Sequence, residues 1–431
     1  MNANIPKTVN PLKNPLKGTI KVPADKSISH RAAIFAALTR KEVLIGNFSL
    51  GADCKSTLSV LEQLGVEINF QSENNLSVLN KKGFKEPKNI LYAGNSGTTI
   101  RLMAGILATS SFTSSITGDE SLKKRPMGRI INPLKQMGAN ISAEDNDTKA
   151  PIIIKGSKLK GIMHNSQISS AQVKSCILLA GLNAEGKTIF REPVKSRDHT
   201  ERLLAYLGAD IEVEDTKVKI KQSELQSKPI SIPGDISSAA FFIVAACIIP
   251  DSEIVIEGIG LNPTRTGIID VMKQMGAKIT ILNQRIECNE EIGDIKINYS
   301  KLKGITIGKE MIPAIIDELP IIAVAATQAE GTTIVKEAEE LRHKESDRIK
   351  AVCLNLKKLG ADIEEALDGF VVHGKTQLRG NCVLETYHDH RIAMTGYVAG
   401  LASLKPVKIN EFNWVNISFP EFTDIFAKII H

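Results

Sequence analysis

The sequence predicts a mixed α/β protein of six repeated units, three in each of two domains. A chain of 431 residues is too long for one hydrophobic core. Five helix ends share the pattern Leu/Met-Gly-small-x-Ile, and glycine suits the left-handed residue that ends a helix. Their glycines are Gly65, Gly138, Gly208, Gly276 and Gly360.

A second series of landmarks alternates with these glycines. Six strand-like segments follow Ala-rich helical stretches, and their centres are residues 44, 116, 189, 255, 334 and 408. The sixth copy lacks the Leu-Gly helix end and is expected to finish in a helix over 419–430. Because two independent landmarks agree, we interpret them as supersecondary repeats that pack together to bury their faces. An ordinary α/β chain with recurring helix caps is the alternative.

Composition narrows the class of protein. Apolar residues make up 42% and charged residues 24%, as in ordinary soluble proteins. The apolar run 239–250 is too short to span a bilayer and predicts a buried helix, and the N-terminus shows no signal or transit peptide pattern. Six scattered cysteines without a CxxC pair favour reduced thiols in a cytoplasmic protein. The net charge of +6 is spread along the chain and aromatic residues are 4%, which disfavours nucleic-acid binding. These totals are equally compatible with a small anionic ligand.

The stretch "KVPADKSISHRAAIFAAL" at 21–38 predicts an anion site at a helix start. We expect Ser27 or Ser29 to cap the helix, beside Lys26 and Arg31. A capped, solvated helix start is the alternative.

Three further helix starts in the first half carry polar or cationic groups. A Gly/Asn/Ser/Thr-rich turn around Gly97 leads into an apolar helix but is not a P-loop. A basic run at 123–129 includes Arg125. Ser170 and Gln172 open a third helix, and Arg197 precedes a fourth. Helix caps and a solvated basic face are the alternatives.

The second half repeats this arrangement with acids included. Asp317 and Glu318 precede an apolar helix, and the two alternatives for a carboxylate there are a helix cap and a general base. Lys344 and Arg348, spaced i, i+4 around Glu345, are expected on one helical face. The segment 388–391 ends in Arg391, and its His-x-His lacks the further ligands of a metal site, so we predict no metal. Together these starts predict a cleft between domains for highly anionic small molecules.

Seven of these segments carry a resemblance to a known family. They are "KSISHR", "GNSGTTIRL", "KKRPMGR", "SSAQVKS", "SRDHTER", "ELRHKESDR" and "HDHRIAM". From about residue 16 onward, the order and spacing of these motifs resemble those of the 5-enolpyruvylshikimate-3-phosphate (EPSP) synthase family. The motif sequences are similar to those of its bacterial class II branch. The resemblance implies an inverted α/β barrel of six βαβαββ repeats with the active site in the interdomain cleft. It places one domain at 21–234 and the other at 1–20 plus 235–431.

The family reaction transfers the enolpyruvyl group of phosphoenolpyruvate to the 5-hydroxyl of shikimate 3-phosphate, without metal or cofactor. The resemblance implies catalytic roles for Lys26, Asp317 and Glu345. The residues implied for shikimate 3-phosphate are Lys26, Ser27, Arg31, Ser170, Gln172, Arg197, Asp317 and Lys344. The residues implied for phosphoenolpyruvate are Lys26, Gly97, Arg125, Gln172, Arg348 and Arg391. The protein is expected to act as a monomer, with neither a membrane nor a nucleic acid as partner.

Two positions depart from another branch of this family. Ile417 stands where that branch has a lysine, and Leu102 where it has a proline, and both bear on inhibitor sensitivity. One rival function is enolpyruvyl transfer to UDP-N-acetylglucosamine, but no cysteine lies between Cys54 and Cys176, where that family has a reactive one. A second rival is a non-catalytic anion-binding protein on the same scaffold.

Overall fold

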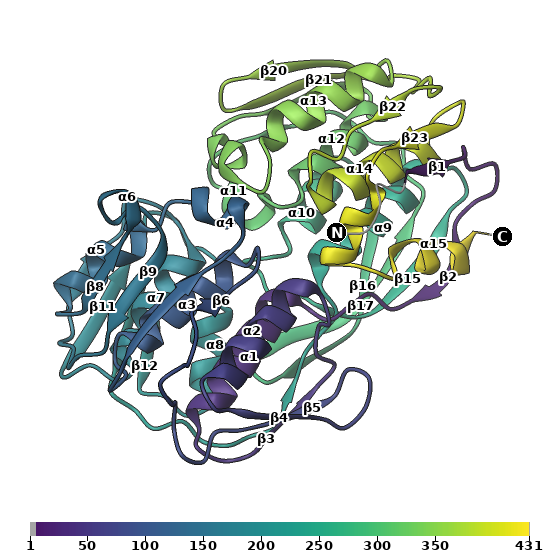
Figure 1. The fold of residues 1–431 in the computed structure, drawn as a ribbon. Helices are drawn as coiled ribbons and strands as arrows, with labels where there is room; N and C mark the ends of the chain where they lie inside the picture. Colours follow the sequence, from purple (N-terminus) through teal and green to yellow (C-terminus); the bar gives the residue numbers. More distant parts are fainter. Residues whose placement is uncertain (1–5, 431) are drawn as a thin grey trace. The chain divides into compact units, whose positions relative to one another are not determined.

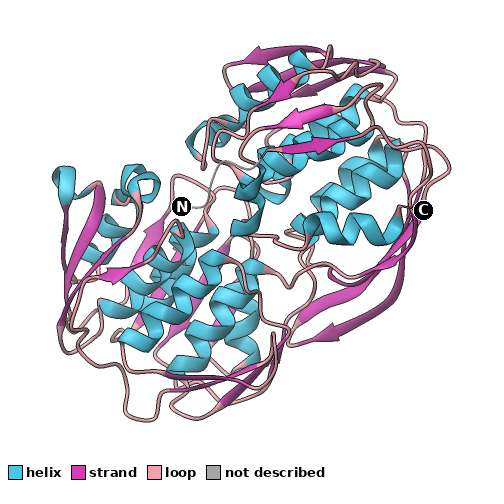
Figure 2. Ribbon diagram, turned by 45° about the vertical axis from the view of Figure 1, so that its right-hand side comes forward, coloured by secondary structure: helices cyan, strands magenta, loops and turns pink. Residues whose placement is uncertain are grey.

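The computed structural model describes residues 6–430, which form two compact units, each with its own apolar core (Figure 1). The N-terminal unit contains Ala24–Ile232 and the short segment Ile286–Glu290. The C-terminal unit contains Pro233–Arg285 and Glu291–His431, together with the chain up to Pro23. Within each unit the helices lie inside and the sheets form outer faces (Figure 2). No helix of the described residues is both long and apolar enough to cross a bilayer.

The N-terminal unit contains three four-stranded sheets, counted over its described residues. Their strand orders are β14-β3-β5-β4, β6-β7-β9-β8 and β10-β11-β13-β12. The strands are β3 (Val43–Gly46), β4 (Glu67–Phe70), β5 (Leu76–Leu79), β6 (Leu91–Tyr92), β7 (Thr113–Thr117), β8 (Asn140–Ala143), β9 (Lys149–Lys155), β10 (Met163–Asn165), β11 (Lys187–Arg191), β12 (Ile211–Glu214), β13 (Lys217–Lys221) and β14 (Ile230–Ser231). In each sheet the first strand runs parallel to the second and the third runs antiparallel to it.

Two kinds of helix fill this unit. Three inner helices are almost fully buried: α1 (Lys26–Leu38), α3 (Gly97–Leu107) and α7 (Ala171–Gly181). The others are α2 (Ala52–Gln63), α4 (Glu120–Lys124), α5 (Gly128–Gln136), α6 (Glu144–Asp147) and α8 (His199–Tyr206). Small residues let the inner helices approach closely, because a Cβ on Gly105 would lie 2.2 Å from the carbonyl oxygen of Cys176.

The C-terminal unit repeats this design. Over its described residues the strand orders are β16-β17-β15-β2, β18-β19-β21-β20 and β1-β23-β22. The strands are β1 (Lys7–Val9), β2 (Lys17–Ile20), β15 (Glu253–Gly260), β16 (Lys278–Glu287), β17 (Glu290–Asn298), β18 (Thr306–Ile307), β19 (Gly331–Val335), β20 (Asp362–Ala366), β21 (Gly369–Gly374), β22 (Val383–Leu384) and β23 (Val407–Ile409). The inner helices are α9 (Ile236–Ile248), α12 (Leu319–Thr327) and α14 (His390–Leu401), and α9 confirms the buried helix predicted from the apolar run.

The remaining helices of this unit are shorter or less completely buried than the inner three. They are α10 (Gly267–Gln274), α11 (Ile312–Ile315), α13 (Arg348–Lys358), α15 (Phe422–Ile429) and two 3₁₀ helices, η1 (Glu339–His343) and η2 (Phe412–Ile417). The inner helices α9, α12 and α14 contact one another. The three inner helices therefore form one apolar bundle.

The predicted repeats are confirmed by both series of landmarks. All five glycines end an outer helix with a φ between 86° and 95°, the left-handed region that glycine adopts without strain. Each of the six predicted strand centres lies in a different sheet, in β3, β7, β11, β15, β19 or β23. From β2 onward the element order follows βαβαββ five times, with short helices inserted, and the sixth repeat ends as βαβα.

The resemblance placed residues 1–20 with the second domain, but the strand pairings that put them there were not predicted. β2 precedes α1 in the chain but pairs in parallel with β15, whereas β14 precedes α9 and pairs with β3. The sixth sheet takes its antiparallel strand, β1, from the start of the chain. Since an unpaired edge of β23 would expose a row of backbone groups, β1 completes a repeat that has no hairpin of its own.

Candidate active site

The start of α1 carries the first group of predicted ligands in the N-terminal unit. Asp25, not Ser27 or Ser29 as predicted, caps the helix, because its carboxylate already accepts the Ile28 N–H at 2.8 Å. Ser29 instead donates its hydroxyl to the carbonyl of Asp25 at 2.8 Å. Lys26 begins the helix and donates to the Oδ2 of Asp53 at 2.9 Å, while remaining partly exposed. The ammonium of Lys26 is therefore held by a carboxylate and still accessible.

Arg31 lies one turn further on and is 2% exposed. Its Nε donates to the hydroxyl of Thr200 at 2.7 Å and its Nη2 to the hydroxyl of Ser175 at 2.8 Å. Its Nη1 donates to the carbonyl of Ser27 at 2.9 Å. Hydroxyls on α7 and α8 thus fix the plane of the Arg31 guanidinium.

The α3 start brings together three residues predicted for phosphoenolpyruvate. A Cβ on Gly97 would lie 3.3 Å from the Nη1 of Arg125 and 3.6 Å from the Oε1 of Gln172. It would lie 2.6 Å from the Nη1 of Arg101, which itself donates to Gln172 at 2.6 Å. Asn95 accepts from the Nη2 of Arg125 at 2.7 Å. A side chain at residue 97 would displace the Arg101 guanidinium from this group, whereas glycine leaves room for these side chains to converge.

Ser170 and Arg197 lie on neighbouring elements of the same unit. Ser170 is the N-cap of α7, with its hydroxyl accepting from Val173 N at 3.5 Å, so its predicted position at a helix start is confirmed. Arg197 is half-buried in the segment between β11 and α8. Ser169 ties this segment to α7, because its hydroxyl donates to the carbonyl of Val194 at 2.7 Å.

Arg348 is the centre of the predicted residues in the C-terminal unit. It is the first residue of α13 and is 1% exposed. Its Nη2 donates to Glu345 at 2.6 Å, its Nη1 to Asp317 at 3.2 Å and its Nε to Asp389 at 2.7 Å. Three carboxylates from three parts of the chain therefore surround one buried guanidinium.

Lys344 and Arg391 complete this cluster. The Nζ of Lys344 lies 3.6 Å from Asp317 Oδ1. Arg391 donates to the backbone carbonyl of Asp317 at 3.0 Å, and its Nη1 lies 3.6 Å from Glu318. The structure thus brings all five predicted site residues of this unit together around Asp317 and Arg348.

One prediction about this cluster was wrong. Lys344 and Arg348 do not share a helical face, because Lys344 ends the 3₁₀ helix η1 in an extended conformation and α13 begins only at Arg348. Asp347 caps α13 by accepting from Lys350 N, which stops the helix from extending back to Lys344. The two cations meet through Asp317 instead.

The charges of the cluster stabilise one another. Burial alone would lower the pKa of Arg348, but Asp389, Glu345 and Asp317 outweigh it and raise that pKa. Burial alone would raise the pKa of Asp389, yet Arg348 holds it below its usual range. Both groups therefore stay charged at neutral pH, and the arrangement keeps carboxylates fixed where protons could be exchanged.

Several residues of these clusters were missed as site components. They are Asp53, Ser175, Thr200 and Asp389. Asp389 could have been found, because Asp is a preferred N-cap and its carboxylate caps α14 by accepting from Arg391 N. No local signal marked Thr200, which contacts Arg31 across 169 residues.

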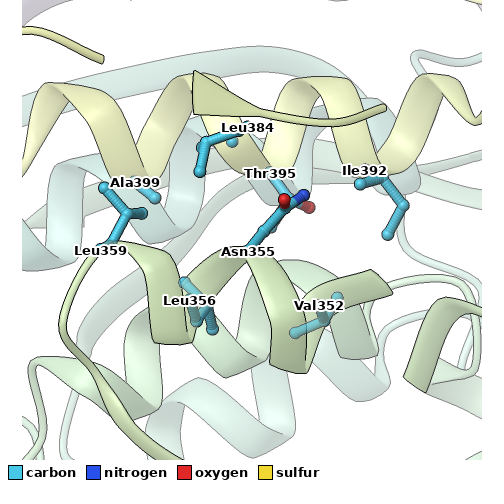
Figure 3. Close-up of a pocket in the computed structure, with 9 residues that line it drawn as sticks. Val352, Asn355, Leu356, Leu359, Leu384, Ile392, Thr395 and Ala399 are labelled. Atoms are coloured by element: carbon cyan, nitrogen blue, oxygen red, sulfur yellow. The ribbon is translucent and has the colours of Figure 1, made fainter. Parts of the chain in front are cut away.

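Neither the histidine motif nor the apolar cavity provides a second site. His388 packs on the Trp414 ring and pairs with Glu411 at 3.2 Å, whereas His390 is buried. Among the described residues, no group of three or more His, Cys, Asp or Glu has a metal-binding arrangement. A small cavity between α13 and α14 is lined mainly by apolar side chains, including Val352, Leu356 and Ile392 (Figure 3), and suits no phosphate.

The chain is similar to proteins of one function. A family model for EPSP synthase (3-phosphoshikimate 1-carboxyvinyltransferase) matches residues 12–426. A 3-phosphoshikimate 1-carboxyvinyltransferase of Petrotoga mobilis is 51% identical over 426 residues, covering 98% of both chains. One from Bacillus cereus is 49% identical, covering 98% of this chain and 99% of the relative. A solved EPSP synthase from Acinetobacter baumannii is 41% identical with a TM-score of 0.89, covering 99% of this chain and 98% of that one.

Proposed function

This chain belongs to the EPSP synthase (3-phosphoshikimate 1-carboxyvinyltransferase) family, and on that premise we propose how its residues act. It is a transferase that moves the enolpyruvyl group of phosphoenolpyruvate to the 5-hydroxyl of shikimate 3-phosphate. The hydroxyl oxygen bonds to C2 of phosphoenolpyruvate while a proton is added at C3. Inorganic phosphate then leaves C2, and a proton is lost from C3 to restore the double bond.

In this proposal the N-terminal unit binds the anionic groups of the substrates. Arg31, Ser170 and Arg197 hold the phosphate of shikimate 3-phosphate, with Ser27 and Gln172 beside them. The cluster of Gly97 and Arg125, joined by Gln172, binds phosphoenolpyruvate. Lys26 is accessible at the start of α1 and contacts both substrates. The partial positive charge at the starts of α1, α3 and α7 favours anion binding there.

The C-terminal unit supplies the groups that move protons. Asp317 binds the reacting hydroxyl and accepts its proton, and Glu345 carries the proton added to and removed from C3. Arg348 and Arg391 bind phosphoenolpyruvate, and Lys344 binds shikimate 3-phosphate. Positioned acids and bases typically contribute about 10²–10⁴-fold to a rate.

One observation carries this assignment. Asp317 and Glu345 come from different elements, yet both accept from the same buried guanidinium, that of Arg348. Fixed carboxylates next to cations weaken the attraction for an anion, so a protein that only bound anions would need them solely to hold its cations in place. Fixed carboxylates are what a proton-transfer step requires.

The proposal is tested by phosphate release from phosphoenolpyruvate by the purified protein. We expect release with shikimate 3-phosphate, and none with UDP-N-acetylglucosamine or without an acceptor. Release with UDP-N-acetylglucosamine would identify the sister activity, and binding of shikimate 3-phosphate without release would identify a non-catalytic protein. Lys26→Ala should abolish nearly all release, with the exposed Lys81→Ala as its control.

We further propose that the enzyme acts as a cytoplasmic monomer with domains at 21–234 and at 1–20 plus 235–431. The scattered cysteines without a disulfide pattern support a reducing compartment. Each unit has its own apolar core, which supports two domains. Sedimentation at micromolar concentration checks the monomer, and a dimer mass contradicts it.

A further inference from the structure

Three buried charged side chains lie directly behind the residues proposed to bind phosphate in the N-terminal unit. They are Lys174 of α7, Glu192 after β11 and Glu201 of α8, each with a side chain only 1–2% exposed. The Nζ of Lys174 lies 2.7 Å from Oε1 of Glu192 and 2.8 Å from Oε1 of Glu201. We name these three residues the buried triad.

The buried triad holds the segment that carries Arg197. The Nζ of Lys174 donates to the carbonyl of Ser196 at 3.3 Å, and Oε1 of Glu192 accepts the N–H of Ser196 at 2.9 Å. Both backbone groups of Ser196 are therefore bonded to the triad. The next residue is Arg197, so the triad fixes the backbone from which that guanidinium projects.

The buried triad also borders the contacts that hold Arg31. Ser175 follows Lys174 on α7, and Thr200 precedes Glu201 on α8. The hydroxyls of Ser175 and Thr200 lie 2.6 Å apart, and each accepts a hydrogen bond from Arg31. The ion pair of Lys174 and Glu201 thus joins the two helices next to the point where they hold Arg31.

Stability alone does not explain the buried triad. Two carboxylates and one ammonium carry a net negative charge away from water, and this favours proton binding. Burial raises the pKa of Glu201, and the two glutamates outweigh the burial of Lys174 and raise its pKa. Apolar side chains of similar volume often match or exceed the stability that such a buried ion group provides.

We infer that Lys174, Glu192 and Glu201 are positioning residues for the phosphate of shikimate 3-phosphate. The hydrogen bonds of Lys174 and Glu192 set the backbone next to Arg197, and the ion pair of Lys174 with Glu201 sets the spacing of the hydroxyls that hold Arg31. Apolar side chains could fill the same space but could not bind the N–H and carbonyl of Ser196. This inference rests on the proposed function.

The test replaces the charges while keeping the volume, in Lys174→Met/Glu192→Leu/Glu201→Met. The chain offers a matched control in Lys219, whose Nζ contacts Glu212 at 2.9 Å and Glu214 at 2.5 Å on the exposed β12–β13 hairpin. The control variant is Lys219→Met/Glu212→Leu/Glu214→Met. Thermal unfolding establishes that each variant is folded, and calorimetry measures the Kd for shikimate 3-phosphate.

We expect the buried variant to fold and to bind shikimate 3-phosphate about 10- to 100-fold more weakly, as a misplaced binding group does. The KM for phosphoenolpyruvate should change less than the KM for shikimate 3-phosphate. The control variant should bind like the wild type. Glu192→Gln, which keeps an acceptor for Lys174 and Ser196, should also bind normally.

A folded buried variant with wild-type affinity would overturn the inference and leave the proposed function intact. If the triple variant fails to fold, Glu192→Leu is compared with Glu192→Gln, and equal affinities of that pair would overturn it as well. If the wild type itself gives no binding heat with shikimate 3-phosphate, the proposed function fails and this inference falls with it.

Discussion

Arg31 in the N-terminal unit and Arg348 in the C-terminal unit are almost equally buried but are held by different acceptors. Arg31 donates to two hydroxyls and a carbonyl, whereas Arg348 donates to three carboxylates. Hydroxyls fix a guanidinium without adding negative charge, and carboxylates fix it while cancelling its charge. The comparison suggests a division of labour in which cations of both units bind anions, and the C-terminal unit adds the carboxylates proposed to move protons.

The largest expected effect concerns the proton-transfer side of this comparison. Asp317→Asn keeps the shape of the side chain but removes its basicity, so turnover should fall by about 10²–10⁴-fold. The Kd for shikimate 3-phosphate should change far less, because Asn can still accept from Arg348. Initial rates and calorimetry are compared on one preparation. Equal losses in affinity and rate would make Asp317 a binding residue and remove the contrast between the units.

The second prediction compares the two sets of acceptors through stability. Asp389→Asn leaves Arg348 with one fewer buried counter-charge and should lower the free energy of unfolding by about 3 kcal/mol. Thr200→Val removes a neutral acceptor from Arg31 and should cost about 1 kcal/mol. Chemical denaturation measures both. Indistinguishable losses would mean that the kind of acceptor does not matter at these sites.

The third prediction uses pH to test whether His30, buried in the N-terminal unit, stays uncharged in the folded protein. His30 of α1 is buried with its Nδ1 2.6 Å from the Thr57 hydroxyl. Burial lowers its pKa to about 3, with Lys26 and Arg31 adding to the shift and Asp53 opposing it. His30 therefore takes up a proton below about pH 6.5 in the unfolded chain, but only below about pH 3 in the folded protein.

The contribution of His30 to stability is thus complete above about pH 6.5 and falls as the pH drops, by about 1.4 kcal/mol per pH unit. The difference in unfolding free energy between wild type and His30→Asn should shrink accordingly between pH 7 and pH 5. A difference that stays constant over this range would show that His30 takes up its proton in the folded protein.

How much could be predicted from the sequence depended on whether the signal was local. Gly65 and its four equivalents were predictable because a left-handed helix end needs glycine, and Ser170 because serine is a preferred cap. The pairings of β2 with β15 and of β14 with β3 were not, since they join segments more than 180 residues apart and no local signal marks them. Lys174 belongs to the motif "SSAQVKS", but its partners Glu192 and Glu201 lie 18 and 27 positions further along the chain. No local feature of the sequence indicated these contacts.

The smallest expected effect concerns the cysteines, none of which is proposed to bind a substrate or to transfer a proton. Burial raises the pKa of Cys54, and it raises the pKa of Cys176, Cys247 and Cys353 to about 12, so few thiolates form at neutral pH. Treatment of the native enzyme with N-ethylmaleimide should leave activity unchanged. Inactivation that substrate prevents would place a thiol in the reaction and favour the sister activity.

The division of labour is tested most directly by calorimetry of shikimate 3-phosphate on two variants, Arg31→Gln and Glu345→Gln. Both remove one charge from a buried or partly buried site, one in each unit. The account predicts that Arg31→Gln loses measurable binding, whereas Glu345→Gln binds like the wild type and turns over poorly. Normal binding by folded Arg31→Gln, or lost binding in Glu345→Gln, would contradict it.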